Sequence, residues 1–383
     1  MTIFDTLYQS FEKPLDALAD YRRAAWEALK LPLKRQEPFK YMQLAPLWET
    51  PFTLPTSFNP GPIAENTILF INGRFCGSRL PKDIVVLPLT QALKTYSPFL
   101  KKRMALESDP FALLSQTFTL EGVFIYIPPA LQCPVLHIVE QIDQGTVACP
   151  RIHLRMGKHS VAKLKLQRHG QKNYFSSSYL DLALDEGAHL TILQNVDHES
   201  SSWQFDALRA ELKTDSQLKA YYLTQGAACV RSDMRVLLQG ENASATLKGL
   251  NQLTQTSQAH QHIYVEHAAP NAHSNQHFKT VLKDESRASF EGKIYVQQLA
   301  QQTLAYQLNN NLLFGKKAIA NSKPNLEIFA DDVKASHGTT MTRLNQEELF
   351  YLKSRGLNEI TAQGMLEKGF CQEILQEVQV DFN

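Results

Sequence analysis

The segment Ala162-Lys163-Leu164-Lys165-Leu166 follows a polar turn and alternates lysine with small or apolar residues, which is the period of a β-strand. It begins with a small residue, and a large apolar residue stands two positions later. The same arrangement recurs, with 26, 28, 29 and 43 residues between successive small residues, at Ala188/Leu190, Ser216/Leu218, Ala245/Leu247 and Ala288/Phe290. A β-solenoid needs such a repeat, because each coil buries its apolar face only against its neighbours.

Short strand-like runs continue on both sides of this repeat, from about residue 122 to residue 319. The repeat favours a mainly β protein built as a solenoid, and a β-sandwich or antiparallel meander with accidental periodicity is the alternative. We expect an N-terminal helical region with a small hairpin in residues 1–108, the β-core in 109–342 and a C-terminal helical region in 343–383. Helices are predicted over residues 14–29 and 90–106, and the hairpin turns at Asn72-Gly73.

The composition of the 383-residue chain is that of a globular protein, with 43% hydrophobic residues and a formal net charge of +1. No basic block points to nucleic acid or to an acidic membrane surface. The five cysteines are scattered without a C-x-x-C spacing, which favours free thiols in a reducing compartment. Without a leader-like N-terminus or a run of about 18 apolar residues, the protein is expected to be cytoplasmic.

Several catalytic motifs are absent from the sequence. It contains no G-x-x-x-x-G-K-[ST], so nucleotide hydrolysis through a P-loop is not expected, and no H-E-x-x-H, G-x-S-x-G or G-x-G-x-x-G. It also lacks the cysteine spacing that holds iron–sulfur clusters. A group of five histidines is compatible with a metal pair if residues 260–266 form a strand, or with hydrogen-bonded histidines of a β-protein: His260, His262, His267, His273 and His277.

Residues 323–340 read as a strand followed by a polar loop that carries Asp331, Asp332 and His337. Three interpretations of this cluster stay open. The carboxylates could perform acid–base chemistry, as in polysaccharide-active β-solenoid enzymes. His337 could instead be a metal ligand that another chain completes. In the third interpretation the aspartates cap turns and the histidine makes local hydrogen bonds.

After residue 340 the pattern changes to short helices. Asn345 and Glu348 have the spacing of a capping box, and Gly356 is placed to end that helix. A second helix is expected from Asn358 to Gly369 and a third from Phe370 towards Val378. Because helices this short are not stable alone, their apolar face must pack on the solenoid end or on a partner.

The polar segment and the helix after it, residues 323–340 and 347–356, are similar to the C-terminal signature of the SufB/SufD family of iron–sulfur cluster assembly proteins, in its SufD form. Residues 31–41, 70–75, 265–270 and 290–296 resemble further segments of the same family. The resemblance implies a right-handed parallel β-helix flanked by N-terminal and C-terminal helical regions. It also implies a scaffold subunit that is not itself an enzyme.

The resemblance further implies partners: a SufB-like paralogue, and a SufC-like ABC-type ATPase that binds the C-terminal helices. Residues on those helices are Leu349, Phe350, Leu352, Arg355, Met365 and Phe370. Within the motif around Ser336, His337 and Gly338, the resemblance places His337 at the interface with the paralogue. There it would contact a transient cluster or iron, with no cofactor held stably by this chain alone, and the isolated chain could form a homodimer.

Many family members carry cysteine two residues before this histidine, where this chain has Ala335. The resemblance therefore implies a histidine contribution without a thiolate from that position. The nearest rival is a SufB-type scaffold that itself carries the nascent cluster, but that branch lacks the D-D-V-x-x-S-H-G form found here. A polysaccharide-active enzyme using Asp331 and Asp332 is the more remote alternative.

Overall fold

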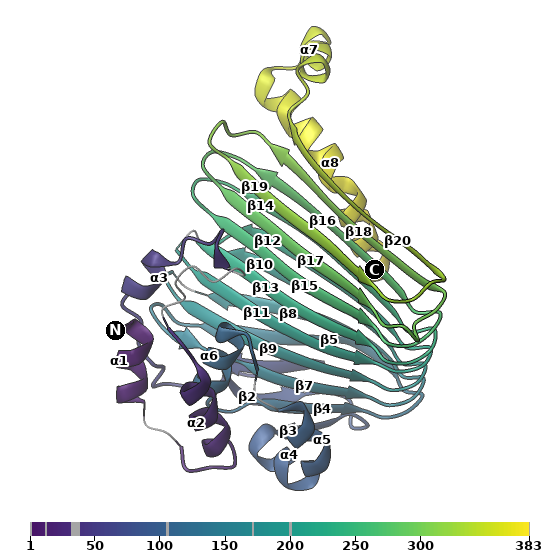
Figure 1. Cartoon of the computed structure of the whole chain (residues 1–383). Helices are drawn as coiled ribbons and strands as arrows, with labels where there is room; N and C mark the ends of the chain where they lie inside the picture. Colours follow the sequence, from purple (N-terminus) through teal and green to yellow (C-terminus); the bar gives the residue numbers. More distant parts are fainter. Residues whose placement is uncertain are drawn as a thin grey trace.

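Two sheets stacked face to face form the body of the molecule, and the chain passes from one to the other at every turn (Figure 1). The computed structural model describes residues 2–11, 14–31, 39–104, 107–170, 172–198 and 201–382. Sheet I contains β1 (Thr67–Ile71), β2 (Arg74–Arg79), β5 (Gln132–Ile142), β8 (Val161–Gly170), β10 (His189–His198), β12 (Gln217–Gly226), β14 (Ser244–Leu253), β16 (His273–Leu282), β18 (Thr303–Leu313) and β20 (Val333–Arg343).

Sheet II contains β3 (Val85–Pro88), β4 (Val123–Ile127), β6 (Val147–Ala148), β7 (Arg151–Met156), β9 (Phe175–Leu184), β11 (Trp203–Leu212), β13 (Cys229–Leu238), β15 (Gln258–His267), β17 (Arg287–Val296) and β19 (Ile319–Ile328). From β7 onward, successive strands alternate between the sheets, and every neighbour within a sheet is parallel. The predicted parallel solenoid is therefore confirmed, and the sandwich or meander alternative is wrong.

One corner of each coil explains the repeat in the sequence. A residue in the left-handed backbone region stands at this corner, as at Asp215 and Asn242 with φ near +56° and +58°. The next residue is small, because its side chain is fully buried under the corner of the next coil; this column consists of Ser160, Ala188, Ser216, Ala243 and Ala272. Amide N–H groups of each coil donate to the carbonyls of the adjacent corner, which joins the coils at this position.

The predicted repeat is partly out of phase with the observed register. Ala162 pairs with Leu190 and not with Ala188, so the first interval is two residues short. Leu190 then pairs with Leu218, and Leu218 with Ala245. Ala288 lies in the other sheet. The error arises because corner residues and inward strand residues are both small, and both stand two positions before a large apolar residue.

The N-terminal helices cover the outer face of sheet II, as Figure 1 shows, and their bounds are α1 (Ile3–Ser10), α2 (Ala19–Ala28), α3 (Ala45–Glu49), α4 (Leu89–Thr95), α5 (Ser97–Arg103) and α6 (Pro110–Phe118). Aromatic rings from both layers meet beneath them, with Phe111 4.2 Å from Phe205. The helix predicted at residue 14 begins at Ala19, and the one predicted over 90–106 is two helices, because Pro98 starts a new first turn. Residues 32–38, 105 and 106 lie outside the described residues.

The predicted hairpin is confirmed, since β1 and β2 are antiparallel and turn at Asn72-Gly73. Its first strand pairs in parallel with β5, so the hairpin extends sheet I beyond the first coil. Gly73 has φ near +78°, and a Cβ there would lie 2.2 Å from the backbone nitrogen of Cys149. The turn therefore packs directly on the chain that leads into sheet II.

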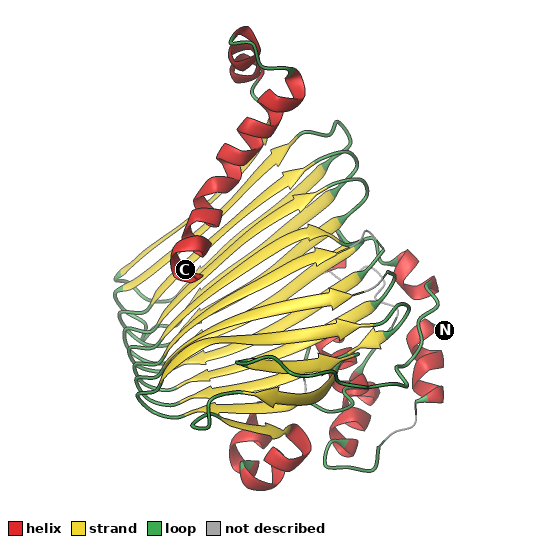
Figure 2. Cartoon of the chain, turned by 180° about the vertical axis from the view of Figure 1, so that it is seen from behind, coloured by secondary structure: helices red, strands yellow, loops and turns green. Residues whose placement is uncertain are grey.

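Two C-terminal helices, α7 (Gln346–Ser354) and α8 (Glu359–Phe382), follow the last strand, and α8 runs along the outer face of sheet I (Figure 2). Asn345 caps α7 and Gly356, with φ near +90°, ends it, as predicted. The separate helices expected on either side of Gly369 are wrong, because α8 continues through that glycine. Carboxylates of α8 pair with a row of lysines on the sheet: Lys219–Asp381, Lys248–Glu377, Lys279–Glu373 and Lys283–Glu367.

Candidate functional site

His337 lies in the middle of β20, which is the last strand of sheet I. The polar loop predicted within residues 323–340 is therefore shorter than expected: residues 329–332 connect β19 to β20, and Ser336, His337 and Gly338 are strand residues. The sequence misled because polar residues fill this strand. In the part of the chain that the structure describes, β20 is the terminal strand of its sheet, so its side chains do not need to be apolar.

The direction of the His337 side chain follows from the register. His337 pairs with Gln307 of β18, and Gln307 is buried inside the solenoid. Directly paired residues on parallel strands point to the same face, so His337 points to the inner face at the open end of the solenoid. Within the described residues no further strand pairs with the outer edge of β20, and the imidazole is exposed. Ala335 shares this face and packs with the last small apolar cluster.

The two aspartates do not join His337 in one site. Asp331 and Asp332 occupy the turn before β20, where the carbonyl of Asp332 accepts the N–H of Gln302 and its own N–H donates to Gln301. His337 is five residues further along an extended strand, or roughly 16 Å away. Among the residues that the structure describes, no group of three or more His, Cys, Asp or Glu side chains could hold a metal ion. The turn is thus joined to the preceding coil through the backbone of Asp332.

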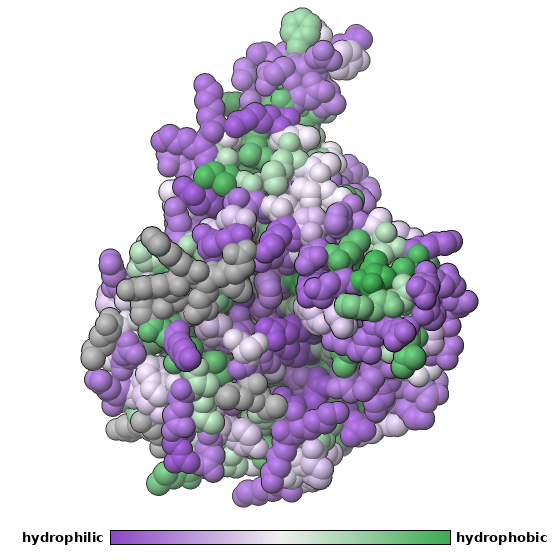
Figure 3. Space-filling view, in the orientation of Figure 1, coloured by the Kyte–Doolittle hydropathy of each residue, from purple (hydrophilic) through white to green (hydrophobic). Residues whose placement is uncertain are grey.

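Apolar side chains surround the open end. Ile328, Phe329 and Met341 are exposed on β19, the following turn and β20. Figure 3, in the orientation of Figure 1, shows a patch of hydrophobic surface on the right of the view, where the last strands end. Each of these strands also has one edge with unpaired backbone groups, because each is the terminal strand of its sheet. Apolar surface and open edges of this kind are features of a protein–protein contact.

Four of the five histidines between residues 260 and 277 are each hydrogen-bonded to a different residue. His260 bonds to Ser289, His262 to Asp233, His267 to Ser274 and His277 to Asn310, each through a ring nitrogen 2.7–2.9 Å from its partner. Burial lowers the pKa of His260 to about 3 and that of His267 to about 4. These four histidines are therefore hydrogen-bonded residues of a β-protein, which is the second of the two interpretations of the group.

All five cysteines have thiols that resist ionisation. Burial raises the pKa of each thiol, to about 11 at Cys133 and Cys371. Cys149 and Cys229 are fully enclosed beneath the N-terminal aromatic layer. Because the thiolate is the form that binds metal and attacks sulfur, these environments suit structural cysteines better than reactive ones.

The predicted partner-binding residues of the C-terminal helices divide into two kinds. Leu349 is buried, and Phe370 packs with Cys371 and Ile374 against the outer face of sheet I. Phe350 is 74% exposed, and Met365 and Arg355 are also exposed, whereas Leu352 is half-buried. Tyr351 and Ile360 add exposed apolar area that the sequence reading did not select. The two helices therefore offer an uncovered apolar surface at the far end of the chain.

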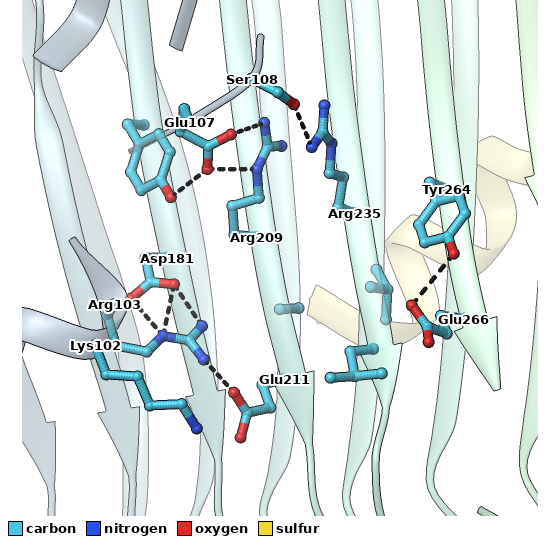
Figure 4. Close-up of a pocket in the computed structure, with 14 residues that line it drawn as sticks. Lys102, Arg103, Glu107, Ser108, Asp181, Arg209, Glu211, Arg235, Tyr264 and Glu266 are labelled. Atoms are coloured by element: carbon cyan, nitrogen blue, oxygen red, sulfur yellow. Dashed lines mark hydrogen bonds and ion pairs between the residues drawn. The ribbon is translucent and has the colours of Figure 1, made fainter. Parts of the chain in front are cut away.

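A groove of about 430 Å³ on the outer face of sheet II holds charged residues that the sequence reading missed (Figure 4). Arg103 pairs with Asp181 and Glu211, and Arg209 with Glu107 and Asp233. The signal was present in the register, since Asp181, Arg209 and Arg235 occupy one row across β9, β11 and β13. The alternation of side chains within one strand could not reveal this charged row, because the row forms only when strands of successive coils lie side by side.

These charges neutralise one another and serve attachment. Although burial opposes ionisation, Arg209 holds the pKa of Glu107 below its usual range, and His153 and Arg103 do the same for Asp181. Neither carboxyl has the raised pKa of a general acid. Arg103 and Glu107 belong to the N-terminal region and their partners to the solenoid, so the network fastens one to the other.

Comparisons with known proteins agree with this architecture. The family model for the SUF system FeS cluster assembly SufBD core domain matches residues 138–370. A SufBD family protein of Synechocystis is 32% identical over 253 residues, which cover 66% of this chain and 54% of that protein. Escherichia coli SufD is 29% identical over 280 residues, covering 71% and 66%. The chloroplastic protein ABCI7 of Arabidopsis thaliana is 31% identical over 209 residues, covering 53% and 43%.

The matched segments thus span about half to two thirds of the length of the curated relatives. Within the described residues, no helix is long and apolar enough to cross a membrane.

Proposed function

Because the chain belongs to the SufBD family of iron–sulfur cluster assembly proteins, we propose that it is a SufD-like scaffold subunit without catalytic activity of its own. It pairs with a SufB-like paralogue through the open end of the solenoid, and with a SufC-like ABC-type ATPase through α7 and α8. The cluster or iron that it handles is cargo at the interface with the paralogue. In isolation, the same open end pairs with a second copy of the chain.

One observation carries this proposal: an exposed imidazole at the open end of the solenoid, without a thiolate beside it. The imidazole of His337 offers nitrogen atoms as ligands, and Ala335, the preceding inward-facing residue of β20, has no thiol. The raised pKa values of all five thiols make this chain a poor source of thiolate ligands. This chain therefore contributes an imidazole to the site, and the paralogue contributes the thiolate.

Replacing His337 with alanine is expected to abolish cluster formation by the reconstituted complex while leaving the melting temperature unchanged, because the side chain is exposed. Cluster absorbance after anaerobic reconstitution with the paralogue and the ATPase measures the effect. His273→Ala, at another exposed histidine of sheet I, is the matched control and should assemble normally. Normal cluster formation by the His337→Ala complex would return this residue to a local structural role.

The ATPase contact has its own prediction. Phe350→Asp is expected to weaken binding of the SufC-like ATPase by roughly 30-fold, the effect of losing one central apolar anchor of about 2 kcal/mol. Isothermal calorimetry with the purified ATPase measures it. Val380→Asp is the control and should bind normally. Val380 is a similarly exposed apolar residue, but it lies near the C-terminal end of α8, far along the chain from Phe350 in α7. Equal affinity of the Phe350 variant would place the contact elsewhere on the chain.

The SufB-type role, in which this chain itself carries the nascent cluster, is separated by one measurement. A SufB-type scaffold purified anaerobically after reconstitution alone retains cluster absorbance, whereas the proposed subunit acquires none without its paralogue. The remote alternative, a polysaccharide-active enzyme, would release products from pectin-like substrates.

A further inference from the structure

A column of polar side chains leads from His337 into the solenoid. By register, His337 of β20 lies beside Gln307 of β18, and Gln307 lies beside Gln276 of β16. Earlier coils place Leu247 and Ala220 in the same row, so the row changes from apolar to amide only near the open end. Gln276 and Gln307 are 0% and 2% exposed. Amides in this position are costly to bury unless their polar atoms have partners.

The two amides satisfy each other only in part. Nε2 of Gln307 donates to Oε1 of Gln276 at 2.9 Å. Within the described part of the chain, Oε1 of Gln307 and Nε2 of Gln276 are buried without a hydrogen-bond partner. Exchanging O and N in both amides reverses the bond and again leaves one acceptor and one donor unused. The pair therefore ends in a group that needs a partner on the side towards His337.

The geometry directs that group. Because Nε2 of Gln307 is bonded to the preceding coil, Oε1 is the atom of the same amide that is left for the terminal coil, in which His337 is the paired residue. Gly292, in β17 across the interior, makes room for this arrangement, because a Cβ there would lie 2.0 Å from Nε2 of Gln307. A glycine and two glutamines from three strands thus combine to hold one amide beneath the imidazole.

We propose that Gln307 is a positioning residue for His337. Its carboxamide oxygen, which has no partner among the described residues, is the atom that an N–H of the His337 ring would engage. This fixes the neutral tautomer and leaves the lone pair of the other nitrogen directed outward. Histidines that bind metals commonly have their second nitrogen held in this manner. The role of this positioning in assembly rests on the proposed function, but the positioning itself belongs to the isolated chain.

The tautomer of His337 tests the proposal without any partner. In protein labelled with ¹⁵N at histidine, and assigned with the His337→Ala variant, wild type is expected to show one dominant tautomer. Gln307→Leu should change the tautomer ratio by about fivefold, the size of effect that one ordinary hydrogen bond gives. A change of less than about twofold would overturn the positioning role. Gln261→Leu, at a buried amide that bonds to Asn251 in an earlier coil, is the control and should leave the ratio unchanged.

Two further variants keep the test decisive if Gln307→Leu does not fold. Gln307→Asn withdraws the amide from the imidazole but keeps it polar, and should change the tautomer ratio in the direction of Gln307→Leu. Gly292→Ala displaces the amide and should change the tautomer ratio as Gln307→Leu does. An unchanged ratio in both Gln307→Asn and Gly292→Ala would overturn the proposal. If tautomers shift but His337→Ala still assembles clusters, the proposed function fails and the positioning stands.

Discussion

Replacing Asp233 with alanine is expected to lower the free energy of unfolding by about 3–5 kcal/mol, the usual cost of removing one partner from a buried ion pair. Asp233 is fully buried and pairs with Arg209, Arg231 and His262. Although burial opposes ionisation, Arg209 and His262 hold the pKa of Asp233 well below its usual range. Alanine leaves the buried guanidinium of Arg231 and the largely buried one of Arg209 without this carboxylate.

Urea denaturation followed by circular dichroism measures this loss. Glu285→Ala, which breaks an exposed pair with Lys317, is the matched control and should change stability by less than about 1 kcal/mol. Because the pKa of Asp233 is lowered, its contribution is fully present above about pH 4 and is lost as the pH falls towards the folded pKa. A small effect of Asp233→Ala at neutral pH would mean that Arg209 and Arg231 are satisfied by Glu107 and Asp109 alone.

Replacing Glu140 with glutamine is expected to remove a pH dependence of stability of about 3 kcal/mol. Inside the solenoid, Arg168 lies between Glu140 and Asp206, so one cation faces two carboxylates. Asp206 also accepts from Ser178, Gln194 and Gln204, whereas Oε1 of Glu140 has no partner among the described residues. Burial therefore outweighs the attraction of Arg168 and raises the pKa of Glu140 to about 7 from the ordinary 4.5.

The sign of the effect follows from proton uptake. Between about pH 4.5 and pH 7 the folded protein binds a proton at Glu140 that the unfolded chain does not, so stability falls as the pH rises through this window and is level above it. Glutamine cannot ionise and should remove this fall. Denaturation midpoints from pH 4.5 to 8 give the measurement, with Glu285→Gln as a control that keeps the slope. Parallel pH profiles for wild type and Glu140→Gln would show that Arg168 keeps the carboxylate ionised.

The fold could be predicted from the sequence because every coil of a solenoid needs the same types of residue at the same positions. Each corner needs a left-handed residue and then a small one, and the pairs Gly187-Ala188 and Asp215-Ser216 both satisfy that rule. The phase could not be predicted, because Ala162 has the composition of a corner residue but the position of a strand residue. The third C-terminal helix was a similar error: Gly369 resembles a terminator, but the lysines on sheet I hold α8 straight past it.

Only part of the candidate site could be predicted from the sequence. Residues near each other in the chain, such as Ser336 and His337, were found by pattern. Gln307 and Gln276 stand 30 and 61 residues before His337 and become its neighbours only when coils stack. The ionic groove was missed for the same reason, since Asp181 and Arg209 meet across strands. Local pattern carries no information on which residues share a row.

Because side chains alternate between the two faces along β20, the number of residues that precede His337 in the strand decides which face the imidazole points to. Counted from the corner at Asp332, which leads into β20, an odd or even number of residues decides whether the imidazole points inward or outward. Deleting one residue between that corner and His337 would leave composition and strand propensity unchanged, yet would turn the ring to the outer face and bring Gly338 inward. Length changes that preserve this protein's function should therefore occur in pairs within a strand, or as whole coils.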